Sequence, residues 1–125
     1  MDHETIKVLL VDDDPALLEV LSDILETEGI KSTPARTGAA ALVSIEQQDI
    51  DVALIDIKLE KSSGLDVLRE IKKHSPEIEC IILTGDVSQA TAIAAVNLGA
   101  YSYLRKPYEV DQLLVSILRA AEKRT

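Results

Sequence analysis

Aspartates at two points of the chain have the chemistry to bind a metal ion. Asp12 and Asp13 follow the apolar run Ile6–Val11, and Asp56 follows the apolar run Val52–Ile55. Three carboxylates within a few ångströms repel one another by up to about 4 kcal/mol per pair at an effective dielectric constant of roughly 20. Mg²⁺ offsets such repulsion, since it takes one or two carboxylates beside water and phosphate oxygens. Without a metal, we expect one of the three carboxyl groups to have a raised pKa.

Three further residues at the ends of apolar runs fit the same chemistry. Lys106 supplies an ammonium group suited to pairing with Asp56 or with a phosphoryl oxygen. Thr84 offers a hydroxyl donor, and Gly85 leaves room for a phosphoryl donor to approach. Asp56, Thr84 and Lys106 each have an ordinary explanation when taken alone. Asp56 is typical of a turn, Thr84 of a strand end, and Lys106 of a solvent-exposed surface. The phosphoryl site therefore depends on the fold bringing these residues together.

Short apolar runs alternate with helical patterns, which predicts strands that are each followed by a helix. The expected strands are Ile6–Val11, Ile30–Pro34, Val52–Ile55, Ile78–Leu83 and Ala100–Leu104, and the expected later helices are Gly38–Gln47, Leu65–Lys73, Ser88–Leu98 and Val110–Ala121. Right-handed crossovers place such helices on both faces of one parallel sheet. We therefore predict an α/β, flavodoxin-like (βα)5 doubly wound fold with strand order 2-1-3-4-5. In this fold, ligands bind outside the carboxyl ends of strands 1 and 3.

The first helix has clear end signals. Asp14 is the expected N-cap, which leaves it out of the metal site, and Pro15 takes the first helical position. Gly29 lies just beyond the expected end of the helix. The inner stripe is predicted to consist of Leu17, Leu21, Ile24 and Leu25.

Composition narrows the possible functions. With 125 residues the chain is about one domain long, and we expect its core to span residues 6–121, with terminal residues that are flexible or begin a linker. A net charge of −9 and the absence of Trp and Phe disfavour nucleic-acid binding. Cys80 lies in an apolar run and is expected in the core. A polar N-terminus and the lack of a long apolar stretch predict a cytoplasmic protein without a membrane anchor.

The motifs together resemble the response-regulator receiver domain of two-component signalling, a CheY-like superfamily, from end to end. The matching segments are Val8–Asp13, Leu54–Asp56, Gly64 eight residues after Asp56, Ile82–Gly85 and Gly99–Pro107. Any one of them is a weak signal, whereas all of them in order, each at a strand end, are a strong one.

The resemblance implies that Asp56 takes a phosphoryl group from the phosphohistidine of a sensor histidine kinase or phosphotransfer protein. Mg²⁺ (or Mn²⁺) would be held directly by Asp13, by Asp12 directly or through a water molecule, by Asp56, and by the backbone carbonyl of Lys58. Thr84 and Lys106 would bind the phosphoryl oxygens.

The family also implies a switch and an output. Tyr103 would turn inward as Thr84 moves toward the phosphate, which changes the face formed by helix 4, strand 5 and helix 5. An output domain or effector, and a phosphorylation-dependent homodimer, would respond to that face. Such a domain is a phosphoacceptor that loses its own phosphoryl group rather than a turnover enzyme.

One position departs from the family pattern. Receivers usually carry Pro four residues after the acceptor, whereas this chain has Glu60, which puts the details of the loop Lys58–Ser63 in doubt. Lys58 and Asp86 each lie two residues after a site residue. We hypothesise that they form an ion pair that slows the entry of water and tunes the lifetime of the phosphoryl group.

Two other functions compete with the receiver. In a haloacid-dehalogenase-like phosphatase, Asp12 would be the nucleophile of an Asp-x-Asp motif, but no acidic pair follows Lys106 and Asp56 would have no role. In a receiver-like interaction module that is not phosphorylated, the same fold would act only as a binding surface. A stable adduct on Asp56 would distinguish the receiver from both.

Overall fold

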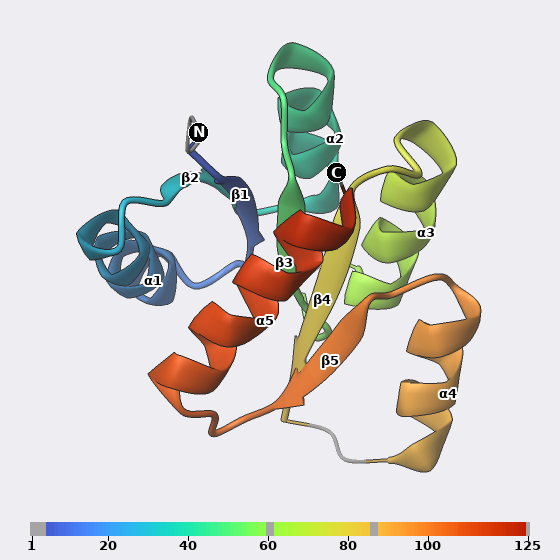
Figure 1. The fold of residues 1–125 in the computed structure, drawn as a ribbon. Coiled ribbons are helices and arrows are strands. Elements are labelled where there is room, and N and C mark those ends of the chain that lie inside the picture. The colour runs from blue at the N-terminus through green and yellow to red at the C-terminus, as the bar shows by residue number, and fades with distance from the viewer. Residues whose placement is uncertain (1–4, 60–61, 86–87, 125) are drawn as a thin grey trace.

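The computed structural model describes residues 5–59, 62–85 and 88–124, in which strands and helices alternate without exception (Figure 1). The strands are β1 (Lys7–Val11), β2 (Lys31–Ala35), β3 (Val52–Asp56), β4 (Glu79–Thr84) and β5 (Ser102–Arg105). The helices are α1 (Pro15–Thr27), α2 (Gly38–Gln47), α3 (Gly64–His74), α4 (Gln89–Asn97) and α5 (Val110–Arg124).

The strands form one parallel sheet in the order β2-β1-β3-β4-β5. The predicted α/β class and strand order are therefore confirmed. Because the order reverses between β1 and β3, the carboxyl ends of these two strands lie side by side, and the loops that follow them diverge. Asp12 and Asp56 are placed at this point.

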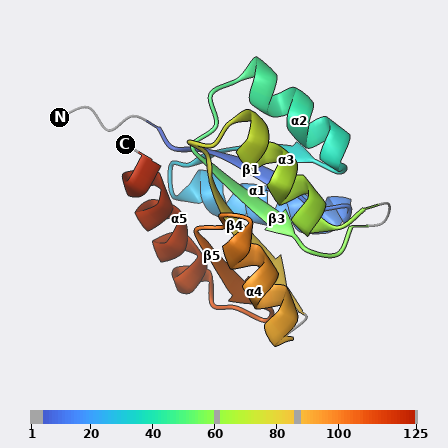
Figure 2. The ribbon, with the colours of Figure 1, turned by 90° about the vertical axis from the view of Figure 1, so that its right-hand side faces the viewer.

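Helices cover both faces of the sheet, with α1 and α5 on one face and α2, α3 and α4 on the other (Figures 1 and 2). Alternate residues of β1, β3 and β4 supply the two apolar clusters, which explains why these strands are almost continuous in Val, Ile and Leu. Cys80 belongs to the cluster beneath α3 and is fully buried, and this burial raises the pKa of its thiol to about 12. The cysteine is thus an inert core side chain, as predicted.

The first helix begins as predicted, but its inner stripe is shifted. Asp14 caps it by accepting hydrogen bonds from the backbone N–H groups of Ala16 and Leu17. The buried residues are Leu18, Leu21 and Leu25. The prediction missed Leu18, and it was wrong to centre the stripe on Leu17 and Ile24, which lie half-buried at its margin.

The two edge strands begin later than predicted, at Lys31 and Ser102 rather than at Ile30 and Ala100. The backbone N–H of Ile30 donates to the Leu25 carbonyl, and that of Ala100 donates to the Ala95 carbonyl. Both residues therefore complete the end of the preceding helix. Among the described residues, no helix is long and apolar enough to cross a membrane.

Candidate functional site

The site is built around Asp12, which is a buried carboxylate. It follows the last residue of β1 and is 3% exposed. Its Oδ1 accepts a hydrogen bond from the backbone N–H of Asp14 at 2.9 Å, but no described residue donates to the buried Oδ2. Burial raises the pKa of Asp12 to about 6, the Asp14 N–H opposes this shift, and the neighbouring Asp56 carboxylate adds to it. The expectation that one of the acidic side chains has a raised pKa is thus confirmed, with burial as the largest cause.

Asp56 is the last residue of β3, and a lysine from the far end of the chain pairs with it. Its Oδ2 lies 3.2 Å from Nζ of Lys106, and its Oδ1 accepts a hydrogen bond from the backbone N–H of Lys58 at 3.1 Å. Its side chain is 13% exposed, so a reactant can still reach it. The structure thus brings together Asp12, Asp56 and Lys106, as the sequence predicts.

Thr84 and Lys106 are linked through the backbone at the ends of β4 and β5. The N–H of Lys106 donates to the Thr84 carbonyl at 2.7 Å, and Thr84 is fully buried. Tyr103 pairs with Ile82 in the register of β4 and β5, yet its side chain is 40% exposed because β5 is the edge strand. In this structure, therefore, Tyr103 is exposed to solvent, whereas Thr84 is buried.

Asp13 is not drawn into the carboxylate pair. Its side chain is half-buried and makes no recorded hydrogen bond or ion pair with a described residue, while its carbonyl accepts from Arg36 Nη2 at 3.4 Å. In the described part of the chain, no three acidic, imidazole or thiol groups form a cluster that could hold a metal ion. The structure places only Asp12 and Asp56 together. The metal site formed by all three carboxylates therefore stays a prediction.

The loop after Asp56 is closed by a glycine. A Cβ built on Gly64 would lie 2.2 Å from the carbonyl oxygen of Asp56 and 2.7 Å from Cα of Ile57, both of them backbone atoms. The Gly64 N–H donates to the Ile57 carbonyl at 2.7 Å, and Lys58 forms an antiparallel bridge with Ser63. Only a glycine can approach the backbone of Asp56 and Ile57 this closely. This close packing at the base of the loop holds Asp56 in place. Glu60, on which the predicted departure from the family rests, lies outside the described residues.

Gly85 has the opposite environment. A Cβ on this residue would meet no described atom within 4 Å, so packing does not require glycine there. The open space beside Thr84 agrees with a role in admitting a reactant. Asp86, the proposed partner of Lys58, lies outside the described residues, and their ion pair stays a prediction.

Tyr108 is a neighbour of the site that the sequence reasoning missed. It is half-buried against the apolar cluster beneath α1 and α5. Burial raises the pKa of its phenol, and the charges of Asp12 and Asp56 raise it further, which places the ring close to both carboxylates. It lies two residues after Lys106 in the sequence, but no local pattern specifies the turn that brings its ring to the site.

Sequence comparisons agree with this geometry. A family model described as "Response regulator receiver domain" matches residues 8–118. The transcriptional regulatory protein GlrR of Escherichia coli (strain K12) is 36% identical over 123 residues, which cover 98% of this chain and 28% of that protein. The probable transcriptional regulatory protein TcrX of Mycobacterium tuberculosis is 34% identical over 99% of this chain and 53% of its own length. The chain thus spans about a quarter to a half of these relatives.

Solved structures give the same answer. A response regulator receiver domain protein (CheY-like) from Methanospirillum hungatei superimposes with a TM-score of 0.92 at 33% identity, covering 97% of both chains. The beryllofluoride-activated NtrC4 receiver domain dimer superimposes with a TM-score of 0.88 at 34% identity, covering 95% of this chain and 98% of that one.

The two glycines make a matched pair for mutation. We expect Gly64→Ala to lower the free energy of unfolding by at least about 2 kcal/mol, because the new methyl group meets rigid backbone. Gly85→Ala should change it by less than about 0.5 kcal/mol, because no atom of the described residues lies within 4 Å of the new methyl group. Urea denaturation measures both values. Equal stabilities for the two variants would show that the backbone contact at Gly64 does not constrain the loop.

The raised pKa of Asp12 predicts how stability depends on pH. Ionising this carboxyl group costs more in the folded than in the unfolded protein, so the folded state loses stability as the pH rises from about 4 through about 6. An amide mimics the neutral acid, so we expect Asp12→Asn to be more stable than the parent protein at pH 7, by on the order of 2 kcal/mol, and equally stable near pH 4. Thermal unfolding in metal-free buffer across this range is the measurement. A variant that is less stable at pH 7 would contradict the assignment.

Proposed function

The chain belongs to the response regulator receiver family, and from this membership we propose that Asp56 is its phosphoacceptor. The observation that carries the proposal is the pairing of Asp56 with Lys106 at 3.2 Å beside the buried Asp12. A receiver is a phosphoacceptor signalling domain of two-component systems.

The transfer needs positioning and charge neutralisation more than covalent chemistry. A carboxylate oxygen of Asp56 attacks phosphorus in the phosphohistidine of a sensor kinase or phosphotransfer protein. The P–O bond forms as the P–N bond breaks, and the imidazole nitrogen keeps the electron pair and ends protonated. Lys106 exchanges its ion pair with Asp56 for contacts with the phosphoryl oxygens. Thr84 supplies a hydroxyl donor once its strand end moves toward them.

Receiver domains bind Mg²⁺ for phosphorylation, and the residues of this site fit such an ion. Asp12 has a buried oxygen without a donor from the described residues, which a hard cation would satisfy. Asp12 and Asp56 would be carboxylate ligands, with Asp13 and the backbone carbonyl of Lys58 completing the protein's share. The ion would neutralise charge on the carboxylates and the incoming phosphoryl group. Mn²⁺ meets the same oxygen ligands.

Phosphorylation would act by shifting a conformational equilibrium, to the extent that the phosphoryl group binds one state better than the other. Tyr103, which is exposed on β5, is the proposed reporter and would turn inward after Thr84 moves. Ile93 and Val96 on α4, and Val115 and Leu118 on α5, are exposed apolar side chains on the two helices of the proposed α4-β5-α5 face. The activated NtrC4 receiver domain described above is a dimer, which supports a phosphorylation-dependent homodimer here.

The relatives also suggest the larger setting. GlrR and TcrX are named transcriptional regulatory proteins, and this chain matches only part of each. Their greater length supports an output domain or effector as the partner of the receiver. Because the net charge is −9, any contact with DNA would belong to that partner rather than to this chain.

The comparisons do not favour the phosphatase or the interaction module without phosphorylation. The family match and the pairing of Asp56 with Lys106 give Asp56 a role that the phosphatase lacks.

Replacement of the acceptor is the primary test. With Mg²⁺ and acetyl phosphate, the parent protein should gain the mass of one phosphoryl group, and Asp56→Asn should gain none, because an amide is not a nucleophile toward phosphorus. Intact-protein mass spectrometry measures this, and circular dichroism shows whether the variant is folded. An adduct that persists in Asp56→Asn but disappears in Asp12→Asn, together with turnover of phosphate monoesters, would instead establish the phosphatase.

The lifetime of the adduct tests the proposed Lys58–Asp86 pair. If this exposed ion pair slows the entry of water, Lys58→Ala should shorten the half-life of the aspartyl phosphate about two- to fivefold, the effect expected of a surface pair. Loss of radiolabelled phosphate measures the rate, with Lys73→Ala as a charge-matched control on α3. Asp86→Asn and the double variant should decay as fast as Lys58→Ala. An unchanged half-life in Lys58→Ala, or additive effects in the double variant, would reject the pair.

A further inference from the structure

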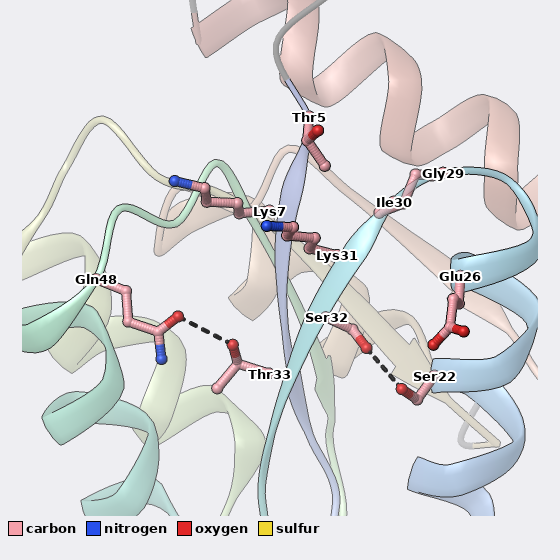
Figure 3. A pocket seen from close by; sticks show the side chains of 10 residues that line it. All are labelled: Thr5, Lys7, Ser22, Glu26, Gly29, Ile30, Lys31, Ser32, Thr33 and Gln48. Atoms are coloured by element: carbon pink, nitrogen blue, oxygen red, sulfur yellow. Dashed lines mark hydrogen bonds between the residues drawn. The ribbon is translucent and has the colours of Figure 1, made fainter.

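A pocket lined mainly by polar residues lies along the open edge of the sheet. It has a volume of about 700 Å³, within the range of about 300–1,000 Å³ that is usual for small-molecule sites. Figure 3 shows it straddling β2, between the end of α1 and the end of α2. It is formed at the amino ends of β1 and β2, whereas Asp56 lies at the carboxyl end of β3. The pocket is therefore separate from the phosphoacceptor site.

Two lysines in this pocket lie side by side without an ion-pair partner among the described residues. Lys7 and Lys31 are paired in the register of β1 and β2, and both side chains extend toward the α2 side of the strand (Figure 3). Like charges opposite each other on neighbouring strands are destabilising. No described carboxylate lies within ion-pair distance of either ammonium, and Asp51 binds the backbone N–H of Lys7 instead. In a chain of net charge −9, the part that the structure describes thus holds two adjacent ammonium groups without a carboxylate at ion-pair distance.

Neutral donors surround the two lysines. The Thr33 hydroxyl donates to Oε1 of Gln48 at 3.1 Å, which fixes the amide and leaves its Nε2 as a donor (Figure 3). Two ammonium groups and an amide N–H on one side of β2 suit an anion with several oxygen atoms, such as a phosphate.

The other side of β2 offers acceptors. Ser22 and Ser32 share a hydrogen bond of 2.9 Å, and the Glu26 carboxylate lies beside them on α1 (Figure 3). These oxygens suit the hydroxyl groups of a ligand. A molecule that spans the strand edge would thus meet positive charge at one end and acceptors at the other.

The backbone of β2 favours a small molecule over an added peptide strand. The backbone N–H of Lys31 donates to the Ile6 carbonyl and therefore points toward β1. Because backbone groups alternate in direction along a strand, those of Ser32 and Pro34 point toward the open edge of the sheet. Proline has no N–H, which leaves Ser32 as the outward N–H donor of this strand. With one of its two outward donors missing, this edge is a poor template for a further strand.

We propose that this pocket binds a small phosphate-bearing polyol of the sugar-phosphate class, with the phosphate at Lys7 and Lys31 and hydroxyl groups at Glu26, Ser22 and Ser32. The site belongs to the receiver fold but takes no part in phosphoryl transfer. The domain would thus respond to a small metabolite in addition to its phosphorylation by a kinase.

Ribose 5-phosphate is a suitable probe for a titration of the whole chain followed by amide NMR in metal-free buffer. We expect saturable shifts at Gly29, Lys31, Ser32 and Gln48. Lys7→Met and Lys31→Met should each raise the dissociation constant at least about tenfold, because each removes a charge-assisted contact. Lys73→Met, which removes an exposed lysine outside the pocket, should bind as the parent protein does. A dispersed spectrum shows that each variant is folded.

Two further titrations test the contributions of the phosphate and of the sugar separately. Inorganic phosphate should shift the same residues more weakly, and neutral ribose should shift them least. The proposal is overturned if ribose 5-phosphate gives no saturable shift, if the shifts centre on Asp56, or if Lys31→Met binds as tightly as Lys73→Met. Equal shifts from ribose and ribose 5-phosphate would also overturn it, because the two lysines would then have no role.

Discussion

The close approach of two carboxylates at the carboxyl ends of β1 and β3 is the constraint on which the site depends. Asp12 is buried and Asp56 nearly so, and each lies where its strand ends. Burial and repulsion from Asp56 both disfavour the charged form of Asp12, and the ammonium of Lys106 offsets only part of that cost. The site is therefore prepared for more positive charge and for a group that Lys106 can also bind. A divalent cation and a phosphoryl group have these properties.

The fold makes this arrangement possible at little cost to its stability. The strands β1, β3 and β4 are mostly apolar and buried on both faces. The repulsion between the carboxylates is therefore confined to the carboxyl end of the sheet. Lys106 reaches Asp56 across β4 because its backbone N–H is bound to the Thr84 carbonyl. Gly64 brings the start of α3 against the backbone of Asp56. The same contacts that position the site thus connect it to β5, where Tyr103 is exposed.

Much of this architecture could be predicted from the sequence, because apolar runs and helix signals depend on local patterns. The strand order and the convergence of Asp12, Asp56 and Lys106 follow from general rules for parallel sheets. The register of burial along α1 was missed by one position at Leu18, since several adjacent residues there are apolar. The nearness of Tyr108 depends on how the chain turns after Lys106, which no local pattern specifies. The placement of Asp13 likewise depends on loop geometry.

The proposed metal site is tested most directly by calorimetric titration of Mg²⁺ at several pH values in buffers of different ionisation enthalpy. If the cation binds to the ionised form of Asp12, its binding should release protons near pH 6, where this carboxyl group is partly protonated, and release almost none near pH 8. The affinity should rise with pH through this range and then level off. Binding that releases no protons near pH 6 would contradict the account, since the cation would then not be neutralising the buried carboxylate.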